Sequence, residues 1–188
     1  MGWLSSIFWA FWYILPAYFA NASPVLVGGG RPIDGGRKWK DGRRLLGDGK
    51  TWRGFIGGVA IGTLVGVIQY FITPDFYGSL GTAVKLAFLL SFGALFGDLV
   101  GSFFKRRANL PRGAPAIGLD QLGFLISALA FAYPLKTLSS GQIIFLLVVS
   151  PFIHWGRTTL PTGWAGRACR GDGWLHFMDF PFFAYFFK

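Results

Sequence analysis

Asp98 is a carboxylate inside an apolar run, residues 86–104, that is long enough to cross a bilayer. A carboxylate at membrane depth is costly unless it meets a partner, an ion or water, so it marks a functional site by default. Ser102, Lys105 and Arg106 follow it at helical spacing, and the four side chains therefore share one stripe of a helix. A metal ligand, a hydroxyl and two cations on one face suit a bound polyphosphate.

A second carboxylate, Asp120, opens the next apolar run. Two carboxylates on adjacent helices are able to converge on one Mg²⁺, an ion that takes one or two carboxylates together with phosphate oxygens and waters. Alone, Asp120 fits equally well as an acidic residue favoured by the dipole at a helix N-terminus. Beside Asp98, we prefer the metal interpretation. Arg112, in the loop between the two runs, is a candidate phosphate contact.

A polar loop before the second apolar run holds further candidates. Asp-Gly recurs there at Asp34, Asp41 and Asp48, a spacing of seven residues. Each pair favours a tight turn, because Asp bonds its own backbone and Gly supplies a positive φ. For Asp34 and Asp41 we prefer this turn interpretation to any chemical role.

The segment 47–54 of the same loop combines glycine-freed amides with cations and a hydroxyl, just before a membrane helix. Amides at a helix start bind anions well. A P-loop is excluded, because its pattern requires glycine where Arg44 stands and a buried strand before it. We therefore predict that this segment binds phosphate. The alternative is that its cationic side chains only extend to the membrane interface. Its candidate residues are Gly49, Lys50, Thr51 and Arg53.

The composition places these residues in a membrane protein. Hydrophobic residues make up 53% of the 188-residue chain and charged residues only 14%, unlike a soluble domain. We predict an all-α integral membrane fold in which five transmembrane helices and their cytoplasmic loops form a polar cavity for the site. The predicted spans are residues 3–19, 55–72, 86–104, 119–138 and 143–155. The first has no basic region before it and no cleavage site after it, so we expect a permanent helix.

Lysines and arginines indicate the orientation of these spans. Eight lie between the first and second spans and four follow the third, whereas the other loops hold only Lys85 and Lys136. The positive-inside rule then predicts a multi-pass protein of the cell membrane with the N-terminus outside and the site on the cytoplasmic side. The net charge of +10 reflects this bias and attraction to anionic lipids. No nucleic-acid fold pattern accompanies it, so nucleic-acid binding is not expected.

The motifs resemble a known family over nearly the whole chain up to His154. Those near the C-terminal half resemble the signature of the CDP-diacylglycerol synthases: Ser102-x-x-Lys105-Arg106, then Gly118-Leu119-Asp120. The short length and the block Asp41-Gly42-x-Arg44-x-x-Gly47-x-Gly49-Lys50-Thr51-Trp52-x-Gly54 resemble the archaeal branch, the CDP-archaeol synthases, more closely.

This resemblance implies that an anionic prenyl-ether glycerol phosphate lipid attacks the α-phosphorus of CTP and releases pyrophosphate, with Mg²⁺ as cofactor. Such a nucleophile is already ionised and needs no general base, and the chain contains no glutamate. Positioning and charge neutralisation then carry the catalysis. The expected roles are Asp98 and Asp120 on Mg²⁺, Lys50, Arg53, Lys105, Arg106 and Arg112 on phosphates, and Ser102 on a phosphate oxygen or metal-bound water.

The family's C-terminal pattern begins at His154 and then disappears. Back-translating the stretch that begins at Arg157 with a shift of one base restores a family-like Ala-Asn-Tyr-Phe-Ala-Tyr segment. We therefore hypothesise a single membrane-embedded domain at 1–156 and a frameshifted tail at 157–188.

Other functional classes fit less well. A transporter of phosphorylated solutes or nucleotides also places charges within spans, but it typically shows inverted repeats, and no such repeat is evident here. A lipid-binding scaffold explains the basic loops and leaves Asp98 without a role. Glycines spaced by three to five residues in the second and third spans favour packing within the chain over a dimer seam. A monomer and a homodimer both remain compatible with the sequence.

Overall fold

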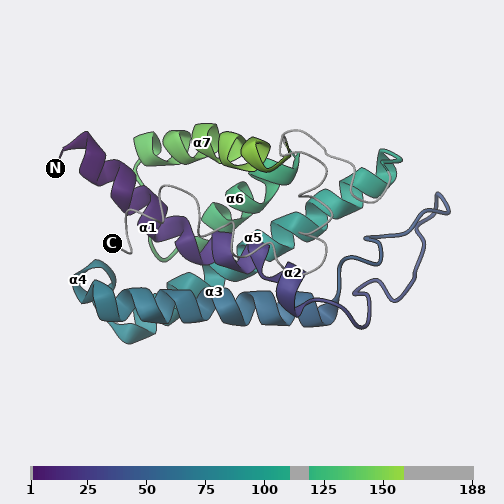
Figure 1. Cartoon of the computed structure of the whole chain (residues 1–188), viewed down its shortest axis with the longest axis horizontal. Helices are drawn as coiled ribbons and strands as arrows, with labels where there is room; N and C mark the ends of the chain where they lie inside the picture. The colour runs from purple at the N-terminus through teal and green to yellow at the C-terminus, as the bar shows by residue number, and fades with distance from the viewer. Residues whose placement is uncertain (1, 111–118, 159–188) are drawn as a thin grey trace. The chain divides into compact units, whose positions relative to one another are not determined.

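The computed structural model describes residues 2–110 and 119–158, and within these ranges gives only the backbone of 119–121 and 152–158. The described chain is helical, and its helices follow one another as shown in Figure 1. They are α1 (Trp3–Ala22), α2 (Pro24–Val27), α3 (Trp52–Ile72), α4 (Pro74–Tyr77), α5 (Leu80–Arg107), α6 (Leu119–Ala132) and α7 (Ser140–Thr158).

Each of the five predicted spans coincides with one of the longer helices, which confirms an all-helical membrane class. Three described segments are long and apolar enough to cross a membrane, namely Trp3–Val27, Trp52–Ile72 and Leu80–Arg107. α6 ends at Ala132 rather than continuing to 138, because Pro134 disfavours a helical conformation at the residue before it. The short helices α2 and α4 were not predicted, and each starts with a proline, which suits the first helical position.

Small residues form the buried face of α3. Gly58, Gly62 and Gly66 are buried one turn apart, whereas the side chains of Leu64 and Phe71 on the same helix are 58% and 72% exposed. A Cβ added at Gly62 would lie 2.1 Å from Ser91 Oγ of α5. This small-inside, large-outside arrangement is expected where lipid surrounds the helices and close backbone approach holds them together. The prediction that these glycines pack within the chain is confirmed.

α5 is the central helix of the described bundle. It packs against α1, α3 and α6, and all of its buried residues are alanine, glycine, serine or leucine. In its C-terminal half, Gly97 approaches α6 so closely that an added Cβ would lie 2.4 Å from the carbonyl oxygen of Gly123. This packing fixes the depth and direction of the stripe that begins at Asp98.

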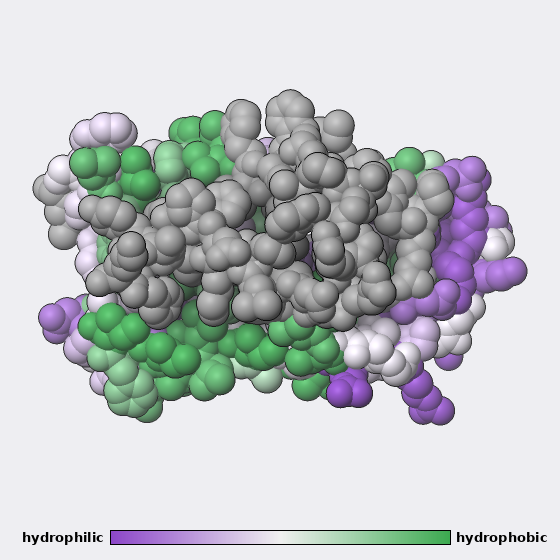
Figure 2. All heavy atoms as spheres, viewed as in Figure 1, coloured by the Kyte–Doolittle hydropathy of each residue, from purple (hydrophilic) through white to green (hydrophobic). Residues whose placement is uncertain are grey.

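The loop between α2 and α3 folds back on itself as a hairpin. Isolated antiparallel bridges join Pro32 to Thr51 and Lys38 to Arg44, and the amide of Ile33 donates to the carbonyl of Lys50 over 2.8 Å. In Figure 1 the loop lies at the same end of the bundle as the C-terminal end of α5. Figure 2 shows the hydrophilic residues gathered at that end, while the visible described surface along the helices is largely hydrophobic.

Candidate functional site

Asp98 of α5 pairs with Lys50, the residue of the loop that lies two positions before α3. Lys50 Nζ donates to Asp98 Oδ2 in an ion pair. The two side chains are 26% and 33% exposed, respectively. The carboxylate therefore has a cationic partner and access to solvent, and both reduce the cost of placing it in a membrane helix. The two sequence segments predicted to bind phosphate and metal thus meet in space.

A small hollow surrounds this ion pair. Gly49, Lys50 and Thr51 line it from the loop, and Leu95 and Asp98 line it from α5. Its volume accessible to the centre of a water molecule is about 30 Å³, which is enough for water but not for a nucleotide. A larger ligand therefore requires Lys50 or its loop to move.

Thr51 has a structural role at the hollow. It is the N-cap of α3, and its side-chain oxygen accepts a hydrogen bond of 3.2 Å from the amide of Gly54. Such caps stabilise a helix start by about 1 kcal/mol. The cap also directs the first turn of α3, where Arg53 is exposed. Phosphate binding by Thr51 and Arg53 stays a prediction.

Asp34 is the anchor that holds the Lys50 segment in place. Its side chain is fully buried and accepts hydrogen bonds from the amides of Gly36, Leu46 and Gly47 at 3.1, 3.1 and 3.0 Å. Arg44 adds two more, from Nε at 3.2 Å and Nη2 at 2.8 Å. The Arg44 guanidinium first, and then these amides, hold the pKa of Asp34 well below its usual range, against the opposing effect of burial.

The predicted turn at Asp34 is therefore confirmed, but the same carboxylate also binds groups farther along the loop. The bond from the Gly36 amide is the expected local one, and Gly35 and Gly36 both have positive φ. The contacts with Arg44, Leu46 and Gly47 lie ten to thirteen residues away. No local motif signals such partners.

Arg107, at the end of α5, docks the loop onto the bundle. It donates to the carbonyls of Arg43 at 3.3 Å and Arg44 at 2.6 Å, and its Nη1 lies 3.1 Å from Asp41 Oδ1. Arg43 donates in return to the carbonyl of Arg107 over 2.7 Å. Arg107 is one of the four basic residues that follow the third predicted span, where it was expected only to help set the membrane orientation; the structure gives it this docking role.

The remaining α5 candidates continue the stripe towards the loop. Ser102, Lys105 and Arg106 lie one to two turns after Asp98, and each is half-buried. Three cationic or hydroxyl groups thus lie between the hollow and the solvent-exposed end of α5. Arg112 lies outside the described residues. Asp120 is the second residue of α6, but its side chain also lies outside the described part, so its convergence with Asp98 stays a prediction.

Of the two predicted Mg²⁺ ligands, Asp98 is the one whose side chain the structure describes. Within the described residues, no group of three or more His, Cys, Asp or Glu side chains forms a metal cage. Asp98 offers one solvent-accessible carboxylate, and Mg²⁺ is commonly held by one or two carboxylates while phosphates and waters complete its shell. Asp98 would hold the ion, and the nucleotide would supply the other ligands.

The chain as a whole is similar to known proteins of one kind. A family model described as CarS-like, CDP-archaeol synthase, matches residues 3–161. The CDP-archaeol synthase of Thermococcus kodakarensis is 94% identical over 156 residues, which are 83% of this chain and 91% of the relative. That of Methanocaldococcus jannaschii is 51% identical over 79% of this chain and 88% of the relative. A solved intramembrane enzyme for archaeal membrane lipid biosynthesis is 40% identical, with a TM-score of 0.73 over 81% of this chain and 94% of its own.

Proposed function

The chain belongs to the CDP-archaeol synthase family, and we propose that it transfers the cytidylyl group of CTP to an anionic prenyl-ether glycerol phosphate lipid. The products are CDP-archaeol and pyrophosphate, in the synthesis of membrane phospholipids. The observation that carries this proposal at the level of the site is the Lys50–Asp98 pair, exposed to solvent within a membrane helix bundle. The transporter alternative is not supported.

The reaction joins two anions and needs no proton acceptor. An oxygen of the lipid phosphate forms a bond to the α-phosphorus of CTP, and the bond from that phosphorus to the bridging oxygen of the β-phosphate breaks. Pyrophosphate leaves with the electron pair. The chain's contribution is to bring the anions together, orient them and neutralise their charge. Lys50, Lys105 and Arg106 bind phosphate oxygens in this scheme, and Ser102 donates to one of them.

Lys50 has a different partner before and after nucleotide binding. Without ligand it neutralises Asp98. An ammonium and a metal ion would compete for the same carboxylate, so Lys50 would leave Asp98 for a phosphate oxygen when the nucleotide binds. Mg²⁺ supplies charge neutralisation on the phosphates when bound, and Asp98, with Asp120, would hold it. The same movement of Lys50 would widen the hollow.

In the membrane, α6 and α7 complete five spans, with the N-terminus outside and the site facing the cytoplasm. α6 has 14 residues, or roughly 21 Å of helix, so it crosses with help from local bilayer thinning or flanking residues. The segment 31–53, which includes most of the loop between α2 and α3, carries eight basic residues, and the last turn of α5 carries three more. Both segments lie at the end of the bundle where Figure 2 shows hydrophilic surface, which supports this orientation. Labelling a cysteine placed at Gly2, in a Cys169→Ser background, with an impermeant reagent tests it: reaction from the cytoplasmic side only would reverse the orientation.

Residues 157–188 are proposed to be read in a shifted frame, while 1–156 form the membrane domain. The Thermococcus kodakarensis relative aligns over 156 of the 188 residues, and the family model matches residues 3–161; neither match reaches over the whole tail. Sequencing the DNA around codon 156 is the test, and one intact frame shared with close relatives would end the hypothesis.

The function itself is tested with purified chain, CTP labelled at the α-phosphate, Mg²⁺ and the prenyl-ether glycerol phosphate. Label should enter the lipid phase with one pyrophosphate released per lipid, and chelation of Mg²⁺ should stop both. Uptake of labelled CTP into sealed vesicles without turnover would overturn the proposal in favour of transport.

A further inference from the structure

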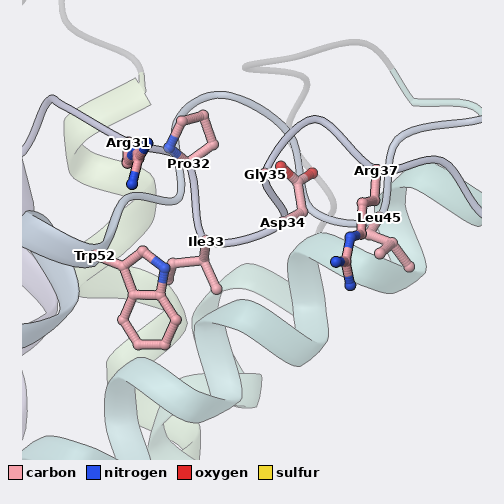
Figure 3. A pocket seen from close by; sticks show the side chains of 8 residues that line it. All are labelled: Arg31, Pro32, Ile33, Asp34, Gly35, Arg37, Leu45 and Trp52. Atoms are coloured by element: carbon pink, nitrogen blue, oxygen red, sulfur yellow. The ribbon is translucent and has the colours of Figure 1, made fainter.

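A second and larger cavity lies in the loop between α2 and α3. Its volume is about 660 Å³, and its lining includes Arg31, Arg37 and Trp52 (Figure 3). Ile33 lines both this cavity and the Lys50–Asp98 hollow, so the two are neighbours. We call it the arginine cavity. Arg31, Arg37 and Trp52 have no part in the proposed transfer reaction.

The guanidinium groups of the arginine cavity are available for an anion. All three aspartates of the loop are already paired, Asp34 and Asp48 with Arg44 and Asp41 with Arg107. Asp34 lines the cavity, but its carboxylate is fully buried beneath its own hydrogen bonds. Arg31 and Arg37 are exposed and have no ion pair or side-chain hydrogen bond in the part of the chain that the structure describes. The cavity is therefore cationic.

The same cavity also presents apolar surface. Trp52, the first residue of the membrane-crossing helix α3, is 52% exposed, and tryptophan at such a position favours the lipid headgroup region. In Figure 3, Arg31 and Trp52 lie towards one end of the cavity, and Arg37 and Leu45 towards the other. Each end thus combines a guanidinium with an apolar side chain. A phosphate group attached to an apolar molecule would fit both the guanidinium groups and the apolar side chains, because guanidinium groups bind phosphate with two parallel hydrogen bonds.

We propose that the arginine cavity binds the phosphate headgroup of a membrane lipid, separately from the hollow that receives CTP. This inference rests on the proposed function, in which the acceptor is a lipid phosphate. Two anionic reactants repel each other, and two separate sites that share Ile33 in their linings would hold them near one another with different polar contacts. The cavity is then where the acceptor lipid is recognised at the membrane surface.

The test measures lipid binding in the absence of CTP, so it does not depend on turnover. Purified chain in neutral detergent is titrated with prenyl-ether glycerol phosphate by microscale thermophoresis, and CTP with Mg²⁺ is titrated separately. Replacing both arginines (R31Q/R37Q) should weaken lipid binding about fivefold to tenfold, since the groups are exposed and partly screened. CTP affinity should change less than twofold, which also shows that the variant is folded.

The matched control is K38Q/K40Q, which removes the same charge from exposed residues of the loop that do not line the cavity. Equal weakening of lipid binding in both double variants would reduce the effect to net charge and overturn the proposal. Loss of CTP affinity with unchanged lipid binding would make the cavity a nucleotide site instead. If free glycerol phosphate displaced the lipid at an equal concentration, the cavity would recognise the phosphate alone, which would overturn the proposal of a lipid ligand. Absence of CDP-lipid formation alongside intact, arginine-dependent lipid binding would count against the proposed function and leave the cavity assignment standing.

Discussion

Replacing Asp34 by asparagine should release the loop that holds Lys50 against Asp98. In the wild type, Oδ1 accepts from Gly36 and Arg44, and Oδ2 accepts from Leu46, Gly47 and Arg44. Asparagine keeps one oxygen and turns the other position into a donor. Its less costly orientation places the new NH₂ group at the Oδ1 position, where two donors lose their acceptor.

The magnitude follows from those two bonds. A hydrogen bond to a charged group contributes about 1.5 to 3 kcal/mol, so the variant should lose at least about 3 kcal/mol of loop stability, and the charge itself is lost as well. Since 1.4 kcal/mol is a factor of ten, the open population of the loop should rise roughly a hundredfold. CTP-dependent turnover should fall with it, because Lys50 is no longer held at the site.

Hydrogen exchange of the Leu46 and Gly47 amides, followed by mass spectrometry, measures this opening directly. Asp48→Asn is the matched control: Asp48 pairs with the same Arg44 at 2.7 Å, but its side chain is 63% exposed. An exposed pair contributes about 0 to 1 kcal/mol, so exchange in the control should quicken less than about fivefold. Similar exchange rates in the two variants would refute the assignment of Asp34 as the anchor of the loop.

Three further outcomes are expected. In the absence of nucleotide, Lys50→Met should raise the affinity for Mn²⁺, because Asp98 loses its competing cation. The same variant should bind CTP more weakly. Paramagnetic resonance of Mn²⁺ measures the metal affinity, and an unchanged value would contradict the proposed competition between Lys50 and the metal for Asp98. Because the pKa of Asp34 is lowered in the folded loop, its contribution to loop stability is full above the unfolded pKa of about 3.9 and is lost as the pH falls below that value. Amide exchange in the loop, corrected for intrinsic rates, should therefore stay slow at pH 5 and quicken only in stronger acid. Faster exchange already near pH 6 would show that another group controls the opening of the loop. Gly62→Leu should disrupt the bundle, because even the Cβ would lie 2.1 Å from Ser91 Oγ, while Leu64→Ala on the exposed face should be tolerated; thermal unfolding in detergent compares them, and equal melting temperatures would contradict the packing.

The helices could be predicted because lipid imposes a simple rule on the sequence. Long apolar runs identified all five of the longer helices, and glycine spacing identified the close-packed face of α3. Their ends were less predictable: α3 starts at Trp52 because Thr51 caps it, and α6 stops before Pro134. Each of these ends depends on a single residue, whose effect is lost when hydropathy is averaged over a window.

The individual residues of the site could be predicted, but not the contacts between them. Asp98 stood out because acids are rare at membrane depth, and Lys50 because it lies in a glycine-rich segment before a helix. Their direct pairing is a tertiary contact across 48 residues, which no spacing rule supplies. The anchoring role of Asp34 and the docking role of Arg107 were not predicted for the same reason, since their partners are distant in the sequence.

The most direct test of the account is the formation of CDP-lipid by Asp98→Asn compared with Asp75→Asn. Asp75 is an exposed carboxylate of α4, so its replacement removes the same charge without touching the Lys50 pair. With labelled CTP, Mg²⁺ and the lipid phosphate, Asp98→Asn should lose nearly all lipid-dependent pyrophosphate release, and Asp75→Asn should retain it. Full turnover by Asp98→Asn would contradict the claim that this acid lies at the centre of the reaction.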